Sequence, residues 1–240
     1  MNVGEAIRFV FEDEEWLTKL LVGAAISIIP LFGGAALTGY AIAVLRNVEA
    51  DSRRPLPTWD ALGEFFVDGL LFWVATLIYS VPLLIFLCPI AVVWVLPAIG
   101  GDNQSATAVL TSIAGIISAG LGCLSLLYGI LLWLISPVLQ IRYAEAGQLA
   151  ACLQFGDVFR FLFRNIGPIV IAQLVLWAAG VVVTTALSGI IGILSLVPIC
   201  GWVIGAVLGL GMLPVGAWLM LVGAHLYAQV ARQSEPAPVV

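Results

Sequence analysis

Four long stretches of the chain contain no Asp, Glu, Lys or Arg, and they dominate its pattern of apolar and polar positions. A membrane-spanning helix needs ~20 apolar residues to cross a hydrocarbon core of about 30 Å. The uncharged stretches run over residues 20–45, 69–101, 103–141 and 165–231. The pattern predicts an all-α integral membrane protein, with a single polytopic membrane domain over residues 1–232 and a disordered cytoplasmic tail at 233–240.

Length and break residues determine how many helices to expect. The second and third stretches each predict one long, tilted or kinked helix, because about 30 helical residues reach about 45 Å. The last stretch is about twice as long and predicts a hairpin that turns at Pro198 to Gly201. Pro30-Leu-Phe-Gly-Gly34 interrupts the first stretch, which is therefore either one kinked span or a tight hairpin of two short helices.

The positions of the basic residues favour the hairpin. All nine Lys and Arg fall in four places, whereas residues 100–107 and 198–201 carry none. The basic places contain Arg8 and Lys19; Arg46, Arg53 and Arg54; Arg142, Arg160 and Arg164; and Arg232. Because Lys and Arg are enriched in short cytoplasmic loops, all four places are expected in the cytoplasm.

Only a hairpin at Pro30 to Gly34 puts the first two basic places on one side. The sequence therefore predicts a six-helix transmembrane bundle in the inner (plasma) membrane, whose first two helices are short and whose N- and C-termini are both cytoplasmic. Arg53 and Ser105 are then expected on opposite sides. Five spans with the N-terminus outside is the alternative, and it leaves Arg8 and Lys19 on the wrong side.

Three segments that precede the apolar stretches combine apolar and charged residues at helical spacing. Such segments typically lie in the headgroup plane as interfacial amphipathic helices, with the aromatic face in the membrane. The opposed faces are Val3, Ile7, Val10 and Phe11 against Glu5, Arg8, Glu12 and Glu15; Trp59, Leu62 and Phe66 against Asp60, Glu64 and Asp68, with Thr58 as N-cap; and Phe155, Phe159, Leu162 and Phe163 against Asp157, Arg160 and Arg164.

The acidic run Glu12-Asp-Glu-Glu15 is expected to stay in water. It precedes the first membrane helix, where carboxylates complement the helix dipole and Trp16 can anchor at the headgroups. Elsewhere, two partners are open for Arg160 and Arg164. They either pair with the acidic stripe of the second segment or bind anionic lipid phosphates.

Composition narrows the classes of function. Hydrophobic residues make up 62% of the chain and charged residues 10%, against about 25% charged in soluble domains. No basic patch of the kind that binds nucleic acid is present. His225 is the single histidine, and the four cysteines (Cys88, Cys123, Cys152 and Cys200) are isolated and are interpreted as buried, inert thiols. We expect no catalytic residue, metal or cofactor, and a protein that is not an enzyme.

Residues 11–70 contain three recognisable motifs. They are Phe11-x-Asp13-x-x-Trp16-x-x-Lys19, Gly39-Tyr40-x-x-x-Val44-Leu45-Arg46 and Pro55-Leu56-Pro57-x-Trp59-Asp60-x-x-Gly63. With them the chain resembles a family of prokaryotic polytopic membrane proteins known only as a domain of unknown function. The resemblance implies the membrane class and brings no activity, ligand or catalytic residue.

The leading interpretation is a non-catalytic membrane scaffold, or a protein that binds lipid or a membrane or cytoplasmic protein partner at its cytoplasmic face. The contact residues expected there are Trp16, Lys19, Trp59, Asp60, Glu64, Asp68, Arg160 and Arg164. Gly201, Gly205 and Gly209 predict a helix-packing seam.

The alternative is a transporter or channel component for an uncharged or lipid-like substrate. No ionisable residue lies in the middle of a predicted span, although such residues usually mark ion paths. Gln173 is the most polar residue well inside a helix, and interhelical hydrogen bonding is its expected role.

Overall fold

The computed structural model describes residues 2–52, 54–99, 103–197 and 200–234, and within them the chain is all-α, 88% helical and without a strand. The helices are α1 (Val3–Arg8), η1 (Phe9–Glu12), α2 (Trp16–Ser27), α3 (Phe32–Glu49), η2 (Trp59–Ala61), α4 (Leu62–Val93), α5 (Leu96–Ile99), α6 (Gln104–Ala146), α7 (Leu149–Cys152), α8 (Phe155–Arg164), α9 (Ile166–Leu194) and α10 (Cys200–Ser234). Of the predicted tail, residues 233 and 234 are helical and 235–240 lie outside the described residues.

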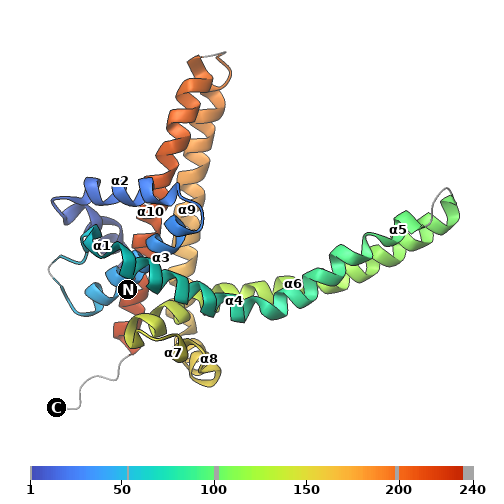
Figure 1. The fold of residues 1–240 in the computed structure, drawn as a ribbon, viewed down its shortest axis with the longest axis horizontal. Helices are drawn as coiled ribbons and strands as arrows, with labels where there is room; N and C mark the ends of the chain where they lie inside the picture. The colour runs from blue at the N-terminus through green and yellow to red at the C-terminus, as the bar shows by residue number, and fades with distance from the viewer. Residues whose placement is uncertain (1, 53, 100–102, 198–199, 235–240) are drawn as a thin grey trace.

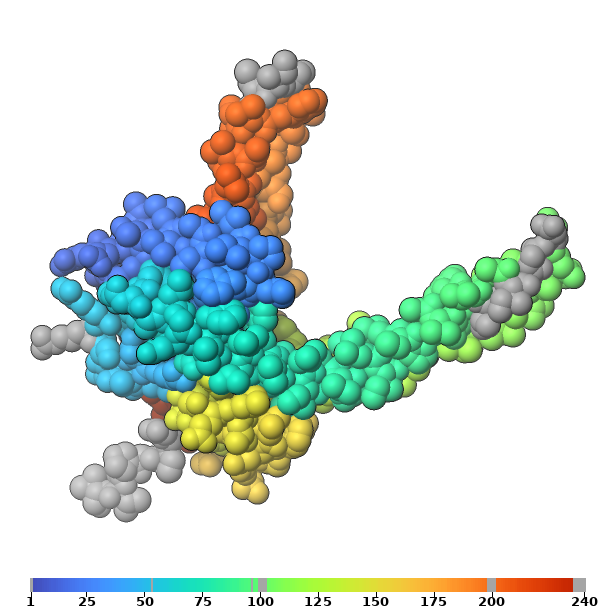
Figure 2. Space-filling view, in the orientation of Figure 1, coloured from blue at the N-terminus to red at the C-terminus, as the bar shows by residue number. Residues whose placement is uncertain are grey.

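Two long helical hairpins diverge from a common base (Figure 1). We call α4 to α6 the first arm and the paired α9 and α10 the second arm. The base consists of α1 to α3, α7, α8 and the adjoining ends of the long helices. On the face shown in the space-filling view the two arms project separately from the base (Figure 2).

Among the described residues, four helices are long and apolar enough to cross a membrane. They cover Trp59–Val93, Gln104–Ala146, Ile166–Leu194 and Trp202–Ser234. The predicted six-helix transmembrane bundle is therefore confirmed only in its coarser form. The first stretch does form two helices. Helix α2 has 12 residues and reaches only ~18 Å at ~1.5 Å per residue. Helix α3 carries two charged residues, Arg46 and Glu49, in its last turn.

The α2–α3 turn and the α3–α4 contact both depend on glycine. A Cβ on Gly33 would lie 2.1 Å from the Ile26 carbonyl oxygen, one on Gly39 1.8 Å from that of Phe65, and one on Gly69 1.8 Å from that of Ala35. The backbones of these helices therefore touch directly. Small residues allow this close approach, and it makes α3 and α4 the tightest seam in the base.

The seam predicted on α10 is looser. A Cβ on Gly205 would meet the Ile191 side chain of α9 at an ordinary 3.6 Å, and one on Gly209 would meet nothing within 4 Å. The surroundings of Gly201 lie outside the described residues.

The three predicted interfacial segments differ in the structure. The first is α1 followed by η1, and it buries Ala6, Phe9 and Val10 while Ile7 and Phe11 are exposed. The second is not a separate helix, because η2 continues directly into α4, and Thr58 stands at its N-cap without a side-chain capping bond. The third is α8, a separate helix of ten residues.

The arms bury few side chains. In each of the four long helices, at most 17% of the most apolar window is buried inside the protein. Cys88 and Cys123 are exposed on α4 and α6, so the expectation of buried thiols is wrong for them, while Cys152 is buried in the base. Apolar surface of this extent needs a lipid or protein environment.

Candidate functional site at the base

Lys19 and Asp13 form an ion pair that is almost fully enclosed. Lys19 Nζ lies 2.7 Å from Asp13 Oδ2, and the two side chains are 11% and 5% exposed. Asp13 Oδ1 also accepts a hydrogen bond from the Glu15 backbone N–H at 2.8 Å. The expectation that the whole acidic run stays in water is thus wrong for Asp13, because its carboxylate turns inward to meet the lysine.

The environment of Asp13 keeps it ionised. Burial by itself raises the pKa of the Asp13 carboxyl, but the hydrogen bond from Lys19, the bond from the Glu15 backbone and the positive charges of Lys19 and Arg54 together lower that pKa below its ordinary value. Charge-assisted hydrogen bonds of this kind stabilise the carboxylate form.

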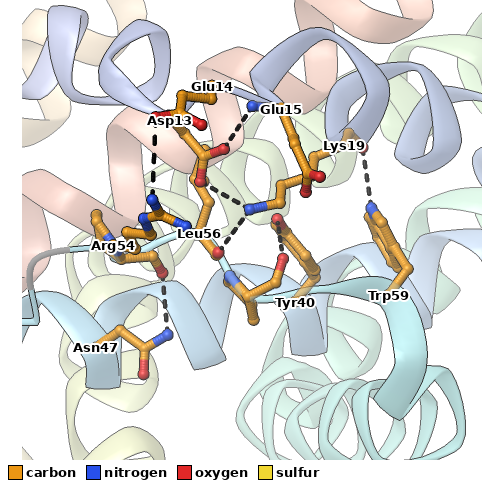
Figure 3. Close-up of polar contacts among 11 residues, drawn as sticks. Asp13, Glu14, Glu15, Lys19, Tyr40, Asn47, Arg54, Leu56 and Trp59 are labelled. Atoms are coloured by element: carbon orange, nitrogen blue, oxygen red, sulfur yellow. Dashed lines mark hydrogen bonds and ion pairs between the residues drawn. The ribbon is translucent and has the colours of Figure 1, made fainter.

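Side chains from α2 and α3 hold the segment Pro55-Leu56-Pro57 by its carbonyl oxygens (Figure 3). Asn47 Nδ2 donates to Pro55 at 3.0 Å, Lys19 Nζ to Leu56 at 3.1 Å and the Tyr40 hydroxyl to Pro57 at 2.9 Å. Proline has no N–H and cannot continue a regular ladder. Side-chain donors therefore satisfy carbonyl groups that regular secondary structure would otherwise pair.

Trp59 closes this network. Its indole N–H donates to the Lys19 carbonyl oxygen at 2.9 Å, and its ring stacks on Tyr40 with centroids 4.2 Å apart. A Cβ on Gly23 would lie 3.0 Å from the same ring. We call Asp13, Lys19, Tyr40, Leu56 and Trp59 the Lys19 network. The three sequence motifs meet in it, and their shared role is to join α2, α3 and the start of α4.

A second network joins α3, α4 and α6. Arg46 Nη1 lies 2.7 Å from Asp68 Oδ2, and Arg46 Nε donates to the Ala144 carbonyl oxygen at 3.0 Å. The Tyr143 hydroxyl donates to Asp68 Oδ1 at 3.0 Å. A surface depression of about 530 Å³ adjoins this network, with Gly63, Glu64 and Gly147 among its lining residues.

The proposed pairing of the acidic stripe with the α8 arginines is contradicted. Asp68 pairs with Arg46, and Arg160 pairs with Asp157 of its own helix at 3.4 Å. Asp60, Glu64 and Arg164 are exposed. The physical reason is placement, since α8 packs on α6 and α9, whereas Asp68 lies against Arg46 of α3.

The other predicted contact residue, Trp16, begins α2 and is half-buried against the Phe11 ring, at 4.9 Å between centroids. Sequence reasoning missed Tyr40, Arg46 and Tyr143 as network members. Tyr40 and Arg46 belong to the second sequence motif, and their place in that motif could have marked them as network members. Nothing local indicated Tyr143, because its partner Asp68 is 75 residues away in the chain.

Helix α8 has three distinct faces. Val158, Phe161 and Leu162 are buried against the base. Phe155 and Phe163 are 49% and 67% exposed, and Phe159 lies between them on the same stripe with its ring stacked on that of Phe163. Asp157, Arg160 and Arg164 occupy the remaining face, because successive residues are ~100° apart around a helix. A helix with an aromatic stripe beside a basic stripe suits a membrane surface.

Gln173 is occupied in holding helices together. Its Nε2 donates to the Trp133 carbonyl oxygen on α6 at 2.5 Å, and its Oε1 accepts from the Tyr227 hydroxyl on α10 at 2.8 Å. It therefore links three long helices, as expected of a polar residue that stabilises packing.

These features define the class: an all-α chain with four helices able to cross a membrane, joined at a polar, tightly packed base. The chain belongs to the family described as "Protein of unknown function (DUF4013)", which matches residues 22–195. The resemblance to a family of unknown function is thus confirmed, and the match includes Tyr40, Arg46 and Trp59 but begins after Lys19. No curated protein and no solved structure matches the chain.

Proposed function

We propose that the protein is a non-catalytic integral membrane protein of the inner (plasma) membrane, with its arms in the bilayer and its base and both termini at the cytoplasmic face. The four apolar helices support the membrane class. Helix α4, with 32 residues, reaches ~48 Å at ~1.5 Å per residue and exceeds a core of about 30 Å, so each arm tilts. Divergent arms are compatible with such tilt (Figure 1).

The orientation rests on charge. Every Lys and Arg that the structure describes belongs to the base or to the base end of a long helix. The positive-inside rule assigns such residues to the cytoplasm. The tips near residue 105 then lie outside.

Cysteine labelling tests this orientation. Arg53 lies outside the described residues, so we choose the exposed Arg54 as the cytoplasmic position. With the native cysteines removed, a membrane-impermeant maleimide on intact cells is expected to label Ser105→Cys and not Arg54→Cys. Labelling of Arg54→Cys alone would reverse the orientation.

At the cytoplasmic face, we infer that α8 binds anionic phospholipid headgroups. The observation that carries this is the arrangement of its faces: the Phe155, Phe159 and Phe163 stripe enters the acyl boundary while Arg160 and Arg164 reach the phosphates. The Arg160 side chain is 82% exposed, so it can reach a lipid. The exposed acidic side chains of Asp60 on η2 and Glu64 on α4 support a second kind of occupant elsewhere on the base, a basic protein partner.

Lipid affinity tests the assignment of α8. The variant Arg160→Gln/Arg164→Gln, titrated with phosphatidylglycerol and followed by native mass spectrometry, is expected to lose about 30-fold in affinity, at about 1 kcal/mol for each arginine. Phosphatidylcholine binding should not change. Arg54→Gln is the matched control, because Arg54 is equally exposed and lies away from α8. Equal phosphatidylglycerol affinity in the wild type, Arg160→Gln/Arg164→Gln and Arg54→Gln would refute the inference.

A further inference from the structure

The single histidine lies in a small polar cleft between the N-terminal segment and α10. The cleft has a volume of about 180 Å³. His225 is buried there, with its ring 4.6 Å from the Phe9 ring. The charged residues that line the cleft come from four elements: Glu5 of α1, Glu12 of η1, Asp51 of the α3–η2 connection and Arg232 of α10.

One glutamine connects this histidine to the start of the chain. Gln229 Oε1 accepts a hydrogen bond from the Asn2 backbone N–H at 2.6 Å, and Gln229 Nε2 donates to the Asn2 carbonyl oxygen at 3.0 Å. Gln229 Nε2 also lies 3.1 Å from His225 Nδ1. Asn2 is the N-cap of α1, where its side chain accepts from the Glu5 N–H. The amide of Gln229 therefore clamps the first turn of α1 to α10.

The two bonds to Asn2 determine the state of the imidazole. The Asn2 N–H requires an acceptor opposite it. The Asn2 carbonyl oxygen, which also accepts from the Ala6 N–H at 3.3 Å, would be repelled by a second oxygen, so only one orientation of the Gln229 amide suits both groups. That orientation presents an amide donor to His225 Nδ1. A donor needs an acceptor, so Nδ1 carries no proton and the neutral ring holds its proton on Nε2.

We propose that His225 is a proton-operated latch, which clamps the first turn of α1 to α10 when the imidazole is neutral and opens that clamp when it is protonated. Protonation puts a hydrogen on Nδ1, so two donors face each other. Rotation of the Gln229 amide would relieve that conflict, but it would turn oxygen toward the Asn2 carbonyl and N–H toward the Asn2 N–H. Protonation therefore weakens the clamp in either orientation, either by repulsion between His225 Nδ1–H and the Gln229 amide N–H or by loss of both bonds to Asn2.

The charges around the cleft bear on proton uptake in opposite directions. The carboxylates of Glu5, Glu12 and Asp51 and the guanidinium of Arg232 all face the cleft, so charges of both signs surround the imidazole. Arg232 is held in place, since it donates to the Val48 carbonyl oxygen and lies 3.1 Å from Asp51. Phe9 and Val10 are buried and keep η1 attached, so opening affects the Asn2 end of α1 and exposes the cleft to the cytoplasm.

Nitrogen NMR on ¹⁵N-histidine-labelled protein in nanodiscs tests the closed state directly, because the chain contains one histidine. At pH 8 the expected spectrum is that of the neutral tautomer protonated on Nε2. The tautomer protonated on Nδ1 would overturn the proposal, and so would an imidazole that is already charged.

Amide hydrogen exchange tests the opening. After correction for the intrinsic rate, protection of the amides of residues 5–8 is expected to fall about tenfold as the histidine titrates, in line with the loss of two hydrogen bonds. His225→Phe keeps the ring contact with Phe9 and should show no such pH dependence, whereas Gln229→Leu should be weakly protected at every pH. The latch would be refuted if protection in the wild type did not depend on pH, or if His225→Phe showed the same pH dependence as the wild type.

Discussion

The base and the arms of this protein are built by different physical rules. The base buries large side chains such as Tyr40, Leu45 and Tyr143, and the two tyrosine hydroxyls donate to the Pro57 carbonyl oxygen and to Asp68. The arms are pairs of apolar helices whose surfaces are mostly exposed, with side chains such as Ile116 and Leu196 more than two-thirds accessible. A change of one atom should therefore matter greatly in the base and little on an arm, where most side chains have open space beside them.

The largest effect is expected from substituting a glycine in the base and comparing it with a glycine on an arm. Gly39→Ala puts a methyl group 1.8 Å from a backbone oxygen, so α3 and α4 must separate. We expect destabilisation of about 3 kcal/mol or more, measured by thermal unfolding in detergent. Gly209→Ala on α10 meets open space and is expected to change stability by less than about 0.5 kcal/mol. Similar losses in both variants would mean that arm and base pack alike.

Removing the lysine of the Lys19 network is expected to have the next largest effect on stability. Lys19→Met leaves the buried Asp13 carboxylate without its partner, at an expected cost of about 3–5 kcal/mol. Arg54→Met is the matched control, because the Arg54–Glu14 pair is exposed and 3.9 Å long. Adding Asp13→Asn to Lys19→Met should restore part of the lost stability in chemical denaturation. If the two single variants were equally stable, the base would not depend on this pair.

Acid should weaken the base through Asp13. Its pKa is lower in the folded protein than its ordinary value of 3.8, so the unfolded chain binds the proton more tightly. The stabilisation is complete above about pH 4 and is lost as the pH falls through the lower, folded pKa. We expect the melting temperature of the wild type to fall more steeply than that of Asp13→Asn between about pH 4 and pH 2. Parallel curves would contradict this assignment.

The smallest effect is expected on α8. Arg160→Glu/Arg164→Glu should change thermal stability in neutral detergent by less than about 0.5 kcal/mol, because both side chains are exposed and the Arg160–Asp157 pair lies within one helix. Adding Glu64→Lys/Asp68→Lys should destabilise the protein, since Asp68 is the partner of Arg46. A gain of stability in the quadruple variant would instead indicate that the α8 arginines pair directly with the acidic stripe.

The comparison also explains which parts of the fold could be predicted. Whether a segment can span a membrane depends on the sum of its own side chains, so the uncharged stretches identified all four long helices. The break at Pro30 to Gly34 is equally local, because proline and glycine act on their own backbone, and the chain forms two helices there. Amphipathic spacing likewise identified α8, whose aromatic and basic residues fall on separate faces.

The interior of the base could not be predicted in the same way. The sequence determined that Glu12 to Glu15 precede the first apolar helix and that Trp16 lies at its start. Only the tertiary structure decided that Asp13, Lys19 and Pro55-Leu56-Pro57 meet Tyr40 and Trp59, that Asp68 takes Arg46 rather than Arg160, and that α1 buries Ala6 instead of Ile7. A charged or aromatic side chain pairs with whatever residue the neighbouring helix brings next to it. Which helices become neighbours depends on the packing of the whole base, and a single segment of sequence contains only one partner of each contact.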